Sequence, residues 1–316
     1  MNKLSVESTP HIRSRSSVSG MMLCVIAALL PAVIAGVLYY GKNAALILLT
    51  TVGSAFLLEL IGSLIIRRKQ SVHDLSAVVT GLILGMLLPP DLALWKASLG
   101  SFIAIILVKQ MFGGIGRNFA NPAAVAWIAM RLIFAKDMTT WRVPDTGAIT
   151  RVTPLVSGGT GYWDLLLGNY ASYIGTGCAA ALLLGMIFLC FSGIISPAAP
   201  VAFLGSFALL TWIGGYDILS QLLTGSLVLA ACFMACDYTT TPFTVSGKLL
   251  FGLGCGILTF LIRHYGGFAE GAVFAIVLMN LLTPAINRIT RKHPFGAVEH
   301  KKDRKKKKPE AESVAV

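Results

Sequence analysis

Five ionisable residues lie within or beside long apolar stretches of this sequence: Glu59, Arg131, Asp237, Arg263 and Glu270. A charge at mid-bilayer costs several kcal/mol, so such groups usually pair or line a polar path. Glu59 lies deepest, and two interpretations remain open: a waypoint for a cation or proton, or a hydrogen bond between helices when protonated. Asp237 and Glu270 lie near predicted span ends, where water would reach them, and are further candidates for the same path.

A second polar feature is the segment 145–155, which reads DTGAITRVTPL. It belongs to the longest connection between apolar stretches, which runs over residues 136–173. By composition alone it is a turn rich in Thr, Gly and Asp, and such turns are common.

The elements that position these residues are predicted to be membrane-spanning helices. Of 316 residues, 55 % are hydrophobic and 13 % charged, whereas about 25 % are charged in soluble domains. The sequence therefore predicts an all-α integral membrane protein with about ten transmembrane helices. They are expected at 21–40, 44–66, 76–89, 94–109, 121–135, 174–195, 198–214, 219–236, 247–263 and 268–287. The third and fifth are short for a bilayer that needs about 20 residues per helix, so they are expected to be tilted, broken or re-entrant.

Basic residues predict the orientation. Placing both termini in the cytoplasm puts most of the 26 Lys and Arg residues inside, as the positive-inside rule requires. Much of the net charge of +12 lies in the C-terminal stretch after residue 287, beside the last apolar segment. This tail is an orientation signal and a contact with anionic lipid, and nucleic-acid binding is not expected.

The sequence therefore divides into five parts. These are a cytoplasmic segment (1–20), a first transmembrane half (21–135), an external loop (136–173), a second transmembrane half (174–287) and a basic cytoplasmic tail (288–316). Thr80-Gly81 leads to Gly113-Gly114 in the first half, and Thr224-Gly225 leads to Gly266-Gly267 in the second. This repeat predicts two inverted five-helix halves, with sites at their interface.

Other chemistry is not indicated. The six cysteines and five histidines form no metal-ligand pattern, and there is no phosphate-binding or dinucleotide-binding glycine motif. The chain is not expected to bind a metal or NADH itself.

Many segments match a known family in order, between about residues 20 and 296. The sequence resembles the family that contains RnfD, from the Rnf ferredoxin:NAD oxidoreductase complex, and NqrB, from the sodium-pumping NADH:quinone oxidoreductase. RnfD is the better match. The matching segments are 74–81, 88–90, 109–110, 112–114, 121–123, 167–170, 174–175, 233–235, 237, 241–242, 247–248, 252, 254–256, 261–263, 266–267, 270–271 and 278–280.

The resemblance implies a covalent flavin. In that family the threonine ending a Ser/Thr-Gly-Ala-Thr motif carries FMN through a phosphoester bond, and Thr-Pro-Leu at 153–155 aligns Thr153 with it. Here Arg151 and Val152 replace the Gly-Ala pair. Thr150 is the alternative attachment residue, and loss of the covalent flavin is a third possibility. Arg142 and Arg151 are candidates to offset the phosphate charge, or are ordinary loop arginines.

The resemblance also implies the function. The chain is expected to be a bacterial inner-membrane subunit that relays electrons, coupled to Na⁺ or H⁺ translocation, with no activity alone. Its partners would be the Rnf-type A, B, C, E and G subunits and a flavin transferase, and riboflavin is expected as a second, non-covalent flavin. A cofactor-free scaffold and a secondary transporter are the alternative functions.

Overall fold

The computed structural model describes residues 17–65, 72–114, 116–144, 146–150, 161–268 and 270–291. Its first half holds α1 (Val18–Tyr40), α2 (Lys42–Ile65), η1 (Val72–Asp74), α3 (Ser76–Met86), α4 (Leu94–Phe102), the π-helix η2 (Ile103–Gln110) and α5 (Pro122–Ile133). A connection follows with α6 (Ala135–Met138), β1 (Trp141–Arg142), β2 (Ile149–Thr150) and α8 (Tyr162–Leu167). The second half holds α9 (Ala179–Phe191), α10 (Ala198–Ile213), α11 (Ile218–Leu223), α12 (Leu227–Leu229), the π-helix η3 (Ala230–Met234), α13 (Val245–Tyr265) and α14 (Ala272–Thr290).

The predicted all-α membrane fold is confirmed. Each of the ten predicted spans coincides with helical segments. Four helices, α1, α2, α13 and α14, are long and apolar enough to cross a membrane singly. The third and fifth spans are short as predicted, with 11 residues in α3 and 12 in α5. In the described part of the chain, the only sheet is the two-stranded β1–β2 hairpin.

Two span predictions were wrong in detail. The sixth span begins as a helix only at Ala179, because residues 168–178 instead bind the end of α3: the Gly175 amide donates to Met86 O at 2.9 Å. The eighth span is not one continuous helix. It breaks between α11 and α12 at Gly225, whose φ of +81° favours glycine.

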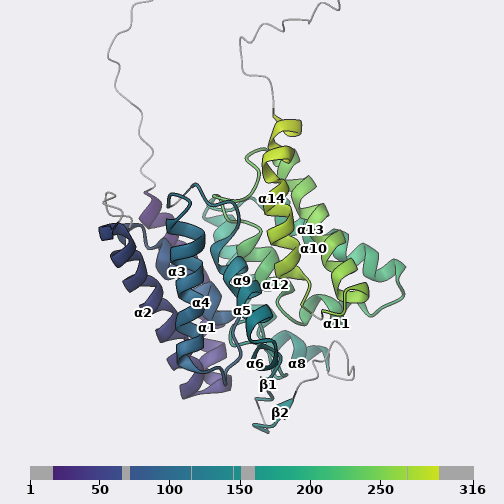
Figure 1. Ribbon diagram of the computed structural model, residues 1–316. Coiled ribbons are helices and arrows are strands. Elements are labelled where there is room, and N and C mark those ends of the chain that lie inside the picture. Colours follow the sequence, from purple (N-terminus) through teal and green to yellow (C-terminus); the bar gives the residue numbers. More distant parts are fainter. Residues whose placement is uncertain are drawn as a thin grey trace, which may run out of the picture.

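The bundle has two distinct ends. α1 begins and α14 ends at the upper end in Figure 1, whereas the β1–β2 hairpin, α8 and α11 lie at the lower end. The first and last helical residues therefore lie on the same side, as an even number of crossings requires. The predicted flavin loop begins at the opposite end from both.

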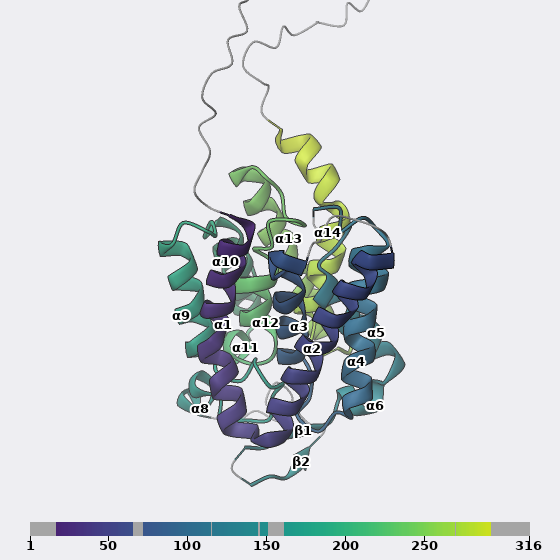
Figure 2. The same ribbon diagram turned by 90° about the vertical axis from the view of Figure 1, so that its left-hand side faces the viewer.

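The two halves repeat one arrangement with reversed direction. In the first half α2 packs on α4 and η2, and η2 packs on α5; in the second, α10 packs on α13, and α13 packs on α14. The halves meet where α1 contacts α9 and α5 contacts α14 (Figures 1 and 2). α3 begins at the upper end, whereas α12 follows α11, which lies towards the lower end, as inverted halves would require.

Close helix approach in the second half depends on glycine. A Cβ added at Gly252 of α13 would lie 2.4 Å from Ala199 O of α10, whereas one added at Gly205 of α10 would meet nothing within 4 Å. We expect Gly252→Ala to destabilise the protein by about 1–3 kcal/mol through overpacking. Gly205→Ala should be neutral or slightly stabilising, because alanine favours helix.

Thermal unfolding of the purified protein in detergent measures both variants. Because both substitutions replace a helical glycine with alanine, the difference between the two unfolding temperatures isolates the effect of packing. Equal unfolding temperatures for the two variants would contradict the close α10–α13 contact.

Candidate functional site

The β1–β2 hairpin is fixed to the membrane core by aromatic packing. Trp141 of β1 is only 4 % exposed, and its ring centroid lies 6.0 Å from that of Tyr173. Tyr173 in turn packs edge-on against Trp127 of α5 at 6.1 Å and donates a hydrogen bond to Met138 O. The strand that precedes the predicted attachment segment therefore has a defined position at the lower end.

An ion pair holds the same hairpin from the other side. Arg142 Nε lies 3.0 Å from Asp91 Oδ2, and its Nη2 lies 2.9 Å from Asp91 Oδ1. The guanidinium is thus bound in the bidentate geometry that arginine forms with carboxylates. The structure gives Arg142 a role in anchoring the hairpin, and its predicted contact with a phosphate stays a prediction.

Replacing Asp91 with asparagine should loosen this anchor. Both side chains are partly exposed, so the cost in folding free energy should be no more than about 1 kcal/mol. The hairpin should nevertheless open more often, which amide hydrogen exchange of the 141–150 peptide would detect as faster exchange. Exchange at unchanged rates would mean that aromatic packing alone holds β1.

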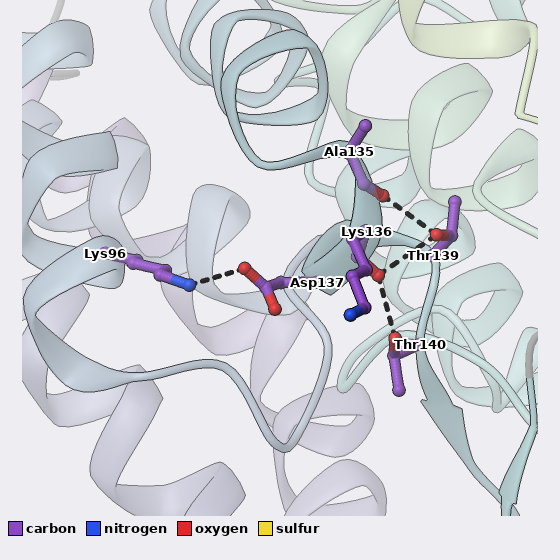
Figure 3. Close-up of polar contacts among 6 residues, drawn as sticks. All are labelled: Lys96, Ala135, Lys136, Asp137, Thr139 and Thr140. Atoms are coloured by element: carbon purple, nitrogen blue, oxygen red, sulfur yellow. Dashed lines mark hydrogen bonds and ion pairs between the residues drawn. The ribbon is translucent and has the colours of Figure 1, made fainter.

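The connection between α5 and the hairpin is also secured (Figure 3). Lys96 of α4 forms an ion pair with Asp137 of α6, and the hydroxyls of Thr139 and Thr140 donate to carbonyls of α6. Lys96 also lies over the ring of Phe134, 4.9 Å from its centroid. These contacts fix the entry into the lower-end connection.

Of the two candidate attachment residues, Thr150 lies within the described part of the chain. Thr150 is the last residue of β2, pairs with Trp141 and is half-buried at the lower end. Thr153 and Arg151 lie outside the described residues. The described strand β2 ends at Thr150, at the lower end of the bundle and three positions before Thr153 in the sequence.

At the upper end, the structure pairs Glu59 with a lysine. Glu59 Oε1 of α2 lies 3.0 Å from Lys109 Nζ of η2, and the two side chains are 0 % and 1 % exposed. Lys109 also donates to Ser76 Oγ at 2.7 Å, at the start of α3. Asp74 lies beside this group: burial raises the pKa of its carboxyl, and the Lys109 ammonium opposes that rise. Glu59 therefore has Lys109 as its partner in a buried cluster.

A cavity adjoins this cluster between the two halves. Its empty space, including the open mouth and the solvent in it, is about 920 Å³. One part of the wall is polar and another apolar. The polar residues include Ser76, Thr80, Lys109, Asn118, Asn121, Asp237, Tyr238 and Thr239, and the apolar ones include Met22, Val25, Ile83 and Phe233.

Asp237 lies on the wall of this cavity. Its carboxylate accepts hydrogen bonds from the Thr239 amide at 3.1 Å and the Thr239 hydroxyl at 3.0 Å. Asn121 Nδ2 reaches it at 3.5 Å from the start of α5, where Asn121 Oδ1 caps the helix. Asp237 thus connects the second half to the first at the cavity.

Glu270 lies at the lower end, away from the other two acidic candidates. It accepts hydrogen bonds from the Ser226 amide at 2.9 Å and the Ser226 hydroxyl at 2.5 Å, at the start of α12. It is only 5 % exposed, so the expected access to water is wrong for this residue. A carboxylate at this position stabilises the free amides of a helix start. The structure therefore brings Glu59 and Asp237 to one cavity region but not Glu270.

The two candidate arginines also have local partners. Arg263 of α13 donates to Gln221 O at 2.6 Å and lies over the Phe207 ring, 5.0 Å from its centroid. Arg131 of α5 donates to Ala135 O at 2.9 Å. In the described part of the chain, no three or more His, Cys, Asp or Glu side chains are grouped so that they could hold a metal ion.

Comparison with known proteins identifies the family. The model of the NQR2, RnfD, RnfE family matches residues 5–296, which is nearly the whole chain. The chain belongs to this family. It is 38 % identical to the D component of the Na⁺-translocating ferredoxin:NAD⁺ oxidoreductase complex of Acetobacterium woodii, over 96 % of this chain and 98 % of that protein. It is 36 % identical to the D component of the proton-translocating ferredoxin:NAD⁺ oxidoreductase complex of Clostridium ljungdahlii, over 93 % and 97 %.

A more distant relative has the same kind of name. The chain is 31 % identical to the D component of the ion-translocating oxidoreductase complex of Halorhodospira halophila, over 91 % of this chain and 94 % of that protein. The resemblance to RnfD is therefore confirmed, and these relatives are all subunits of redox-driven ion-translocating complexes.

Sequence reasoning missed the partners of Glu59. Lys109 is the last residue of the predicted span 94–109, where its ammonium is expected to reach the cytoplasmic side, whereas the structure buries it at the end of η2. A signal was present, because Lys109 ends an apolar run and so borders a predicted span like the five ionisable candidates. The serine at position 76 offered no such signal, since serine is common at helix starts.

Proposed function

We propose that this chain is the membrane subunit of an ion-translocating ferredoxin:NAD oxidoreductase complex, and that it relays electrons through covalent FMN. The family, and the names of its relatives over nearly the full chain, carry the proposal. The complex would lie in the bacterial inner membrane, with the Rnf-type A, B, C, E and G subunits as partners. The upper end would face the cytoplasm and the lower end the outside.

FMN would be attached at Thr153, after maturation by a flavin transferase. Trp141 and Arg142 hold β1 against the core, and β1 pairs with β2, whose last residue, Thr150, precedes Thr153 by three positions. A phosphoester through the threonine hydroxyl leaves the flavin ring free for electron transfer, which is the chemistry that the cofactor supplies. The chain's contribution is to hold it at a fixed end of the bundle.

The cavity at the upper end would hold the second, non-covalent flavin, such as riboflavin. A flavin ring is polar along one edge and apolar elsewhere, and the cavity wall has both kinds of surface. Asn118 Oδ1, on this wall, is buried and has no hydrogen-bond partner in the described part of the chain. A buried polar atom of this kind usually indicates a missing partner. Asn118, Asn121 and Lys109 would bind the polar edge.

Glu59, Asp237 and Glu270 are proposed contacts of the translocated cation. Glu59 and Asp237 would serve the upper end, and Glu270 the lower end. Relatives of nearly equal identity carry names with Na⁺ and with protons. The choice of ion therefore depends on local residues rather than on overall similarity.

Mass spectrometry tests the covalent flavin directly. The complex should be purified from its own host, so that the transferase is present, and digested to release the peptide covering 136–173. We expect the added mass of FMN on Thr153. An unmodified peptide throughout would overturn the covalent assignment and favour the cofactor-free scaffold.

The second flavin needs a separate test. Thr80→Trp should fill the cavity and lower the amount of acid-extractable flavin per complex. Leu57→Trp is the control, because Leu57 is 56 % exposed on the outer surface of α2. Equal amounts of extractable flavin in the two variants would show that no flavin binds in this cavity.

A further inference from the structure

Lys109 connects Glu59 with the cavity wall. Its ammonium lies 3.0 Å from Glu59 Oε1 and 2.7 Å from Ser76 Oγ. Lys109 and Ser76 both line the cavity, whereas Glu59, their buried neighbour, is not among its lining residues. A charge placed in the cavity would therefore act on Lys109 before it acts on Glu59.

The cluster is buried, so its charges must balance. Taking one partner from a buried ion pair is strongly unfavourable, because the remaining charge lacks compensation. If Lys109 is drawn towards the cavity, positive charge beside the Glu59 carboxylate falls. Uptake of a small cation by Glu59 would then restore the balance, and ionisable groups within membranes commonly mark ion pathways.

The lysine side chain is suited to such a movement. Its ammonium is a compact charge on a flexible four-carbon stem, unlike the rigid fork of arginine. Ser76 already provides a hydrogen-bond acceptor on the cavity wall. Lys109 also lies in the π-helix η2, and π-helical turns are frequent at functional sites.

We propose that Lys109 is a charge relay that links an anion in the cavity to cation uptake at Glu59. The inference rests on the proposed flavin in this cavity. A flavin bound there would supply the negative charge when reduced, because two electrons from the partner redox subunits and one proton would leave it with a net charge of minus one. Lys109 would be drawn to that charge, and Glu59 would take up Na⁺ or a proton. Once the charge was removed by reoxidation, Lys109 would return to Glu59 and the cation would be released.

Redox-difference infrared spectroscopy of the purified complex tests this. In the wild type, reduction of the non-covalent flavin should change a carboxyl band that Glu59→Gln removes. In Lys109→Gln the carboxyl band should no longer change on reduction. In Lys109→Arg the band should still change, by a smaller amount. A new band of protonated carboxyl indicates a proton, and a sodium-dependent shift of the carboxylate band indicates Na⁺.

Two results would overturn the relay. One is a wild-type difference spectrum that matches the spectrum of Glu59→Gln. This comparison can be made even if the lysine variants do not fold. The other is a redox-dependent Glu59 band that persists unchanged in Lys109→Gln. Extractable flavin is measured in the same samples. If either result is found while the flavin content is normal, only the relay is rejected. If the wild-type cavity contains no flavin, the proposed second cofactor is rejected as well.

Discussion

Thr153→Ala should abolish flavin fluorescence from this chain after denaturing electrophoresis, whereas Thr150→Ala should retain it. A phosphoester survives denaturation, so fluorescence in the gel reports covalent flavin only. Removing the hydroxyl at position 153 removes the atom to which the phosphate would bond. The expected change is from full to background signal, the largest effect proposed for any substitution in this chain.

Thr150→Ala is a matched control because it makes the same chemical change three positions earlier. Thr150 lies at the end of β2, where its backbone pairs with Trp141 and alanine can keep that pairing. The complex must be produced with its flavin transferase. If Thr150→Ala loses the signal and Thr153→Ala keeps it, the attachment residue is Thr150 and the alignment on Thr-Pro-Leu is wrong.

Lys109→Met should destabilise the protein severely, because it leaves the buried carboxylate of Glu59 with less compensating charge. Removing one partner of a buried pair costs about 3–5 kcal/mol. The double variant Glu59→Leu with Lys109→Met should recover much of that loss, since a buried pair can be replaced by apolar residues at little cost. Unfolding temperature and the yield of assembled complex measure both variants.

Lys96→Met provides the comparison. Lys96 also pairs with a carboxylate, but its partner Asp137 is 44 % exposed. Lys96→Met should lower the free energy of unfolding by no more than about 1 kcal/mol, because water solvates the exposed carboxylate that remains. A Lys109→Met variant as stable as Lys96→Met would show that Glu59 is not charged in the folded protein.

Much of the fold could be predicted from the sequence. Apolar runs gave the positions of the helices, because a bilayer requires every span to satisfy its own backbone hydrogen bonds. The short third span follows from Pro89-Pro90, which cannot continue a helix. The depth of Glu59 was also predictable, since apolar residues surround it on both sides. These features depend on residues that are neighbours in the chain.

Tertiary structure alone decided which polar groups meet. Glu59 finds Lys109 on a different helix, and Glu270 reaches Ser226 across 44 positions. The second contact helps place the break between α11 and α12, which the continuous apolar run 219–236 concealed. Local sequence specifies where a helix is favourable, but the balance of buried charges is set by which helices pack together. For this reason the sequence by itself determined the spans and the family, whereas the shared cavity of Lys109 and Asp237 emerged only from the packed halves.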